Sequence, residues 1–132
     1  MVQIPDDFQQ LLDKPVLYNL ATINPNGSIQ VNPVWGELLD GYIRLNTAAG
    51  RQKHKNLVER GEQVTVMVQD PDNTQRYLEV RGKVAELTEE NGDEVIDGLA
   101  KKYIGADVYP FHQPDETRVT ILIEPTKVFS MG

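Results

Sequence analysis

Short turn motifs divide most of the chain into runs of β-branched and aromatic residues, and this spacing restricts the fold more than any other feature. Residues 24–27 have the sequence Asn-Pro-Asn-Gly and lie between two such runs, 16–23 and 29–35. Asn-Gly is among the strongest short signals for a β-hairpin. A second turn at 39–41, Leu-Asp-Gly, precedes a third run, 42–46. The sequence therefore predicts that these three runs form a three-stranded meander.

Three later segments alternate apolar and polar side chains as half-buried strands do, and helix signals lie between them. These later strands are expected at 64–68, 77–84 and 118–129. Short helices are expected at 5–13, 51–60 and 88–102, and a loop at 104–116. Six strands with inserted helices predict a mainly β fold with short helices, arranged as a small antiparallel barrel. A length of 132 residues predicts a single domain over residues 1–132.

Composition excludes several kinds of site. The chain has no cysteine, which excludes thiol catalysis, iron–sulfur clusters and cysteine-ligated zinc. Its two histidines, His54 and His112, lack a metal-ligand spacing, so no metal site is expected. The net charge of −7 argues against nucleic acid or an anionic membrane surface as a partner. Because no apolar run approaches the ~18 residues of a membrane span and no signal-peptide pattern is present, we expect a cytoplasmic protein.

The segment 51–60 is basic although the chain as a whole is acidic: it contains four of the 13 Lys and Arg residues and one acid. Arg51 and Lys53 stand at the start of the expected helix, where positive side chains oppose the helix dipole at a cost of ~0.3–1 kcal/mol each. With the Thr47 hydroxyl and the free N–H groups of the first turn, they form a donor-rich pocket that suits a phosphate. The alternative, a basic helix face in contact with solvent only, stays open.

Pro33 interrupts a run that otherwise has the pattern of a strand. A proline within a strand indicates a sheet edge or a β-bulge, where backbone groups are free of the sheet. Such groups can hydrogen-bond a flat heteroaromatic ring. Trp35, the only tryptophan, follows closely and fits either a large core residue or part of a ring site. No glycine-rich nucleotide loop occurs in the chain, so a cofactor bound without one fits better.

Three motifs together resemble a known family. They are Pro-Val-Trp at 33–35, Thr-Ala-Ala-Gly-Arg-Gln-Lys at 47–53 with Asn56 and Leu57 following, and Asp-Pro-Asp-Asn at 70–73 leading to Arg-Tyr-Leu-Glu-Val-Arg-Gly at 76–82. The chain is similar to the pyridoxamine 5′-phosphate oxidase-like superfamily of split β-barrel flavoproteins, and most similar to the branch that uses the deazaflavin coenzyme F420. The similarity covers most of the chain, and the third motif is the most specific.

The resemblance implies a split antiparallel β-barrel that forms a homodimer and binds FMN or F420 in a groove between the two protomers. It also implies an oxidoreductase that transfers a hydride to a small unsaturated substrate. The cofactor-binding residues that it implies are Thr47, Arg51, Lys53 and Asn56 at the phosphate, Gln30, Val31, Asn32 and Pro33 along the ring, and Tyr77 and Arg81 from a strand near the dimer interface. Lys55 offers an additional cation for the longer, polyanionic tail of F420.

The residues alone support one part of this interpretation: a chain with no thiol, catalytic triad or metal site needs a bound ring for redox chemistry. No catalytic residue is identified, and the candidates for a proton donor are Tyr77, Tyr109 and His112. One alternative is a non-catalytic module that binds flavin or deazaflavin for storage or sensing. A weaker alternative is a nucleic-acid contact through residues 51–55. Glu79 and Arg81 are expected to form an ion pair on one strand face.

Overall fold

The computed structural model describes all 132 residues and contains one sheet of seven antiparallel strands and three helices. The strands are β1 (Tyr18–Ile23), β2 (Ile29–Val34), β3 (Gly36–Leu39), β4 (Tyr42–Ala48), β5 (Val64–Gln69), β6 (Tyr77–Thr88) and β7 (Arg118–Met131), and the helices are α1 (Asp6–Leu12), α2 (Gln52–Arg60) and α3 (Gly92–Ile104). The order in the sheet is β2-β1-β5-β6-β7-β4-β3. The predicted mainly β, antiparallel barrel with short helices is confirmed.

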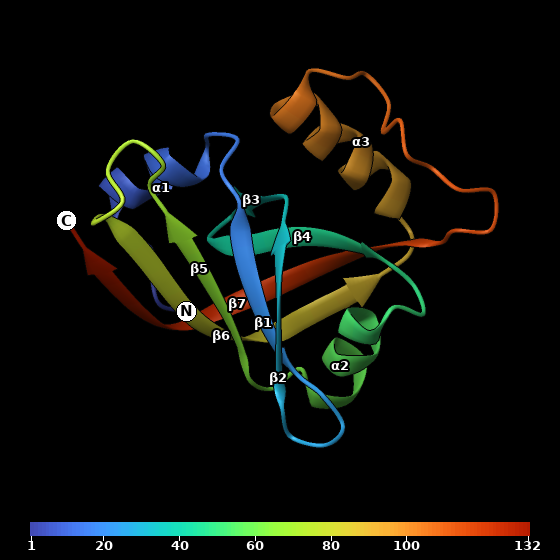
Figure 1. Ribbon diagram of the computed structural model, residues 1–132, viewed down its shortest axis with the longest axis horizontal. Helices are drawn as coiled ribbons and strands as arrows, with labels where there is room; N and C mark the ends of the chain where they lie inside the picture. Colours follow the sequence, from blue (N-terminus) through green and yellow to red (C-terminus); the bar gives the residue numbers. More distant parts are fainter.

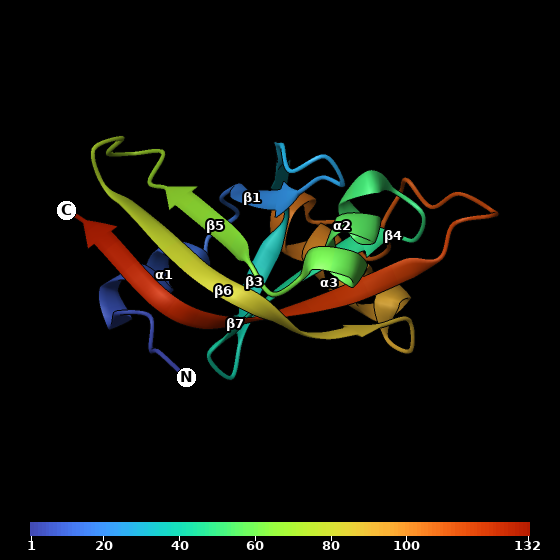
Figure 2. The same cartoon turned by 90° about the horizontal axis from the view of Figure 1, so that it is seen from below.

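The sheet is strongly curled. Figure 2 shows the long strands β6 and β7 bending beneath the rest of the sheet. In Figure 1, α2 and α3 both lie at the end of the molecule away from the C-terminus, beside the loop that leads into β7. This end of the barrel therefore brings together segments that are far apart in the sequence.

The hairpin predicted at residues 24–27 is confirmed. β1 and β2 pair antiparallel from Tyr18 opposite Val34 to Ile23 opposite Ile29. Gly27 has a φ of 85°, a left-handed conformation that glycine adopts without a Cβ clash. β2 is an edge strand of the sheet, as the proline within it predicts.

The predicted meander is wrong, because the third run does not pair with the second. β4 pairs with β7 and with β3, a strand that is not among the six predicted. β3 has only four residues, too few for an alternating pattern to be recognised. The turn at Asp40 and Gly41, with φ angles of 52° and 86°, therefore joins β3 to β4 rather than β2 to β4.

The third helix begins later than predicted. β6 continues through Thr88, which pairs with Thr120 of β7, and α3 begins only at Gly92. The hydrogen bonds of this long strand pair outweigh the local helix signals at residues 88–90. At Gly92 the backbone of α3 approaches β7 so closely that a Cβ atom would collide with the carbonyl oxygen of Arg118. Glycine is required here by packing.

Two apolar clusters organise the molecule. The main core contains 18 buried residues, which come from the strands, from α1 and α2, and from Ile4 and Val16 on either side of α1. A smaller cluster forms where Val95, Ile96 and Leu99 of α3 pack against the half-buried side chains of Trp35, Tyr103 and Tyr109. This second cluster fixes α3 beside the end of β2. None of the helices has the length and apolar character that a membrane crossing requires.

Candidate functional site

A cavity of about 200 Å³ lies between the end of β2, the start of α2, α3 and the loop that precedes β7. The residues that line it are Pro33, Val34, Trp35, Asn46, Arg51, Lys53, Ile96, Tyr109, Phe111 and Arg118. Three of these side chains are cationic and three are aromatic. The cavity thus combines positive charge with flat apolar walls.

The cations come from two segments. Arg51 is the residue before the first turn of α2 and has an extended backbone conformation, and α2 has no acidic residue in its first turn to balance it. Arg118 begins β7, and its side chain is only 4% exposed. Glu116 contacts both guanidinium groups, at 2.9 Å from Nη1 of Arg118 and 3.7 Å from Nη2 of Arg51.

Lys53 is the third cation and has no hydrogen-bond or ion-pair partner in the chain. Burial, and then the positive charges of Arg51 and Arg118, lower the pKa of its ammonium group to about 8. A half-buried charge without a partner is costly. An anion in the cavity would relieve this cost, because it would pair with all three cations.

Arg118 is held in place by a chain of contacts from several elements. Its Nε donates to Oδ1 of Asn46 at 2.7 Å, and Nδ2 of Asn46 donates to the carbonyl oxygen of Gly92 at 2.8 Å. Arg118 is not among the predicted cofactor-binding residues, because it is the first residue of a predicted strand and lies outside the basic segment 51–60. The one available signal was its position next to Val119 at the start of an apolar strand, where an arginine is unusual.

The aromatic walls form a connected group. Trp35 stacks on Tyr103 of α3 with a centroid distance of 5.2 Å, and Tyr109 meets Trp35 edge-on at 6.0 Å. Phe111 then packs edge-on against Tyr109 at 5.5 Å and is 59% exposed. Trp35 thus packs against α3 and also lines the cavity.

Asp97 of α3 fastens the loop that carries Tyr109. Its Oδ1 accepts a hydrogen bond from the backbone N–H of Tyr109 at 2.8 Å and lies 3.1 Å from Nε2 of His112. The bond from the Tyr109 N–H, followed by the contact with His112, lowers the pKa of Asp97. The carboxylate thus stays ionised and holds the aromatic wall against α3.

The family model for pyridoxamine 5′-phosphate oxidase matches residues 4–132, nearly the whole chain. The chain belongs to the pyridoxamine 5′-phosphate oxidase family. A solved F420 reductase is 32% identical, with a TM-score of 0.83 over 96% of this chain and 98% of that one. The predicted membership of this family, near its F420-using branch, is confirmed by these two matches.

Two more distant structures share the fold of the pyridoxamine 5′-phosphate oxidase family. A conserved hypothetical protein from Mycobacterium tuberculosis is 23% identical, with a TM-score of 0.75 over 98% of this chain and 85% of that one. PhzG from Burkholderia lata, solved in complex with tetrahydrophenazine-1-carboxylic acid, is 17% identical, with a TM-score of 0.62 over 88% and 69%. Among curated proteins, none matches the chain.

Of the predicted cofactor-binding residues, Arg51, Lys53 and Pro33 line the cavity of this family member. Thr47 does not line the cavity, and it is only 1% exposed. Side chains alternate along β4, so Thr47 points to the core side of the sheet with Ile43 and Leu45. Its Oγ1 is buried there without a hydrogen-bond partner.

Asn56 also lies outside the cavity, and its side-chain amide is fully used within the protein. It is 0% exposed. Its Nδ2 donates to Oγ1 of Thr22 at 3.0 Å and to Oδ1 of Asn24 at 2.9 Å. Its Oδ1 accepts hydrogen bonds from Gln52 and Arg60. Asn56 therefore fastens α2 to the β1–β2 hairpin.

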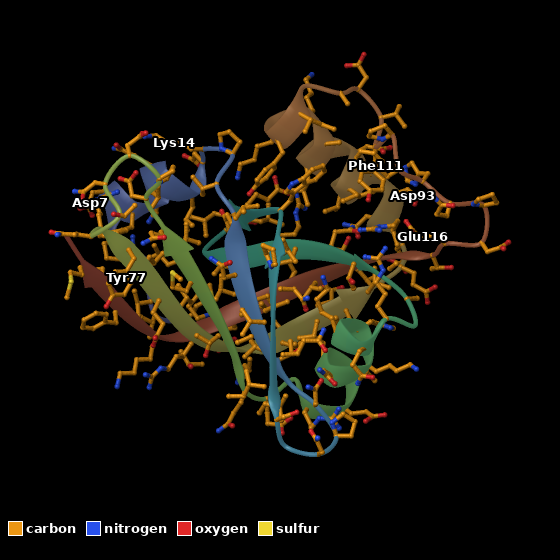
Figure 3. All side chains as sticks on the ribbon, viewed as in Figure 1. Asp7, Lys14, Tyr77, Asp93, Phe111 and Glu116 are labelled. Atoms are coloured by element: carbon orange, nitrogen blue, oxygen red, sulfur yellow. The ribbon has the colours of Figure 1, made fainter.

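The remaining predicted residues lie along two strands outside the cavity. On β2, Nε2 of Gln30 donates to Oδ1 of Asn32 at 2.8 Å, and Val31 is 58% exposed. On β6, Arg81 forms the expected ion pair with Glu79 at 2.7 Å. Figure 3 shows Tyr77 near the C-terminal end of the molecule, and Phe111 and Glu116 at the other end. Within one chain, Tyr77 and Arg81 do not meet the cationic cavity.

Proposed function

We propose that this chain is an oxidoreductase that binds FMN or F420, with the cofactor phosphate held by Arg51, Lys53 and Arg118. The observation that carries the proposal is the unpartnered ammonium of Lys53 in a cavity that also contains two guanidinium groups. The 32% identity to an F420 reductase supports a flavin or deazaflavin as the ligand.

The residues present fit such a cofactor. Guanidinium and ammonium groups are the usual partners of phosphate oxygens, and the adjacent aromatic side chains offer flat surfaces for a ring system. When bound, the reduced ring supplies a hydride to a small unsaturated substrate. The protein binds and orients the cofactor, and Trp35, Tyr109 and Phe111 form one apolar side of the cavity. Tyr109 is the one candidate proton donor that lines the cavity.

The proposal includes a homodimer in which a second copy covers the outer face of the sheet. Ile29 and Val31 on β2 are 68% and 58% exposed, and Phe129 and Met131 on β7 are each 49% exposed. Cross-strand pairing places Val31, Ala21, Thr65, Arg81 and Lys127 in one row across five strands, so they share one face. Exposed apolar patches of this extent are typical of interaction surfaces.

A dimer also accounts for the position of Tyr77 and Arg81. Both residues lie on this outer face, away from the cations of their own chain. Arg81 also lines a hollow of about 540 Å³ on the same face. In the proposed dimer these side chains would reach the cofactor bound mainly by the partner.

The dimer is tested by light scattering of the purified chain and of Val31→Glu. The wild-type chain should have twice the mass of one chain, and the variant should be monomeric while folded. Val58→Glu is the matched control, because Val58 is similarly exposed, at 59%, but lies on α2. A dimer that is unaffected by Val31→Glu would place the interface elsewhere.

Cofactor binding is tested by titrating the chain separately with FMN and F420 and following absorbance and fluorescence. Lys53→Ala should weaken binding by at least tenfold, and Lys101→Ala, an exposed control on α3, should not change it. Unchanged affinity in Lys53→Ala would remove Lys53 from the site.

Turnover is tested by steady-state oxidation of reduced FMN and reduced F420 with a panel of enones and quinones. Oxidation with at least one acceptor is expected. Tight binding without turnover would instead favour the non-catalytic binding module.

A further inference from the structure

Glu116 lies behind the two guanidinium groups of the cavity. Its side chain is 9% exposed, and its carboxylate contacts Arg118 at 2.9 Å and Arg51 at 3.7 Å. Glu116 does not itself line the cavity. The site therefore contains three positive groups facing the cavity and one fixed negative charge next to two of them.

This negative charge opposes any anion that the cations attract. The Coulomb energy between two groups is proportional to the product of their charges, so Glu116 disfavours a dianion twice as strongly as a monoanion at the same position. Solvent and salt screen the interaction less than at an open surface, because Glu116 is nearly buried.

The two candidate cofactors differ in this respect. The phosphate of FMN is a monoester, which carries a charge of roughly −1.5 to −2 at neutral pH, as other phosphate monoesters do. The phosphate of F420 is a diester, which carries a single negative charge. Glu116 therefore acts on the two phosphates with different strength.

We propose that Glu116 tunes cofactor selectivity: because it opposes a phosphomonoester dianion more strongly than a phosphodiester monoanion, it shifts the relative affinity of the site away from FMN and toward F420. This inference rests on the proposed function, because it requires the cofactor phosphate to lie at Arg51, Lys53 and Arg118. Glu116 does not line the cavity, so its charge acts on the phosphate through space, from behind the guanidinium groups that it contacts.

The test compares three ligands with the same ring: FMN, its phosphate methyl ester and riboflavin. Glu116→Gln removes the charge and keeps an oxygen that can accept from Arg118. Fluorescence titration of this variant should show affinity increased by about threefold for the methyl ester and about tenfold for FMN, because the logarithm of the gain doubles with the charge. Riboflavin affinity should not change, because riboflavin carries no phosphate.

Two further variants separate charge from structure. Glu116→Asp keeps the charge and should keep the wild-type ratio of FMN to methyl-ester affinity. Glu116→Ala also removes the charge. It takes the place of Glu116→Gln in the titrations if Glu116→Gln does not fold. Glu89→Gln removes an exposed carboxylate outside the cavity and is the control for net charge.

An equal change for FMN and its methyl ester in Glu116→Gln, or no change for either, would overturn the role of Glu116 and leave the proposed function intact. Failure of the wild-type chain to bind FMN, the methyl ester and F420 would instead overturn the proposed function.

Discussion

The guanidinium carbon of Arg118 lies 5.2 Å from the centre of the Tyr109 ring. This cation–π contact joins the start of β7 to the aromatic wall of the cavity. The same guanidinium bonds to Asn46 and to Glu116, so one side chain connects β4, β7 and the loop before it. Arg118 thus supports the site as well as contributing its charge.

Replacing Arg118 should affect both stability and binding. Arg118→Lys keeps the charge but loses the planar group that stacks on Tyr109 and bonds to Asn46. We expect a loss of about 1–3 kcal/mol in the free energy of unfolding and a loss of about tenfold in cofactor affinity. Urea denaturation and fluorescence titration measure the two quantities. Wild-type values for both would show that the contacts of Arg118 are dispensable.

Asn56 provides the opposite case, a residue that should affect stability alone. Asn56→Ala removes the Nδ2 group that donates to the buried Thr22 hydroxyl and to Oδ1 of Asn24. We expect a loss of about 2–4 kcal/mol, because several buried hydrogen bonds are removed together. Cofactor affinity of the folded variant should stay within about twofold of wild type. A large loss of affinity at unchanged stability would return Asn56 to the binding site.

The pKa of Lys53, lowered to about 8, predicts that binding depends on pH. An anionic cofactor pairs with the ammonium form, so its affinity should be highest below pH 8 and should fall by up to about tenfold between pH 7 and pH 9. Titrations of FMN or F420 across this range measure the effect. Lys53→Met should bind more weakly and show a flatter pH profile, and an equally steep profile in that variant would assign the titration to another group.

The stability of the free protein should change with pH in the opposite direction. The pKa of Lys53 is about 8 in the folded chain and 10.5 in the unfolded chain, so the unfolded chain binds more protons between these values. The contribution of Lys53 to the free energy of unfolding should therefore increase as pH rises from 8 to 10.5, so the folded chain becomes more stable. Urea denaturation of wild type and Lys53→Met at several pH values isolates this contribution, which the variant should lack.

Two glycines of α3 should respond in opposite ways to alanine. At Gly92 a Cβ atom would collide with the Arg118 carbonyl oxygen, so Gly92→Ala should destabilise the chain by about 2–4 kcal/mol. At Gly98 a Cβ atom would meet open space, so Gly98→Ala should stabilise it by about 0.5–1 kcal/mol through helix propensity. Thermal and urea unfolding of the two variants make the comparison. Similar effects of both would mean that α3 does not pack closely on β7 at Gly92.

The local features of the fold were predictable because each depends on neighbouring residues. The hairpin at 24–27 follows from the conformations that Asn-Gly allows, and the edge position of β2 follows from the missing N–H of Pro33. The extra strand β3 and the late start of α3 were not predictable. β3 pairs with the neighbouring strand β4 across a two-residue turn, but its four residues are too few for an alternating pattern to be recognised. The late start of α3 depends on residues that are distant in sequence, because β6 continues to Thr88 opposite Thr120.

The sequence by itself determined that positive charge gathers at the start of a short helix, since Arg51 and Lys53 are close neighbours there. Only the tertiary structure decided which other residues join them. Strand alternation turns Thr47 into the core, and the α2–hairpin contact buries Asn56. The return of β7 brings Arg118 and Glu116 to the same point. A side chain's direction and its distant neighbours are fixed by sheet pairing, which residues nearby in the sequence do not specify.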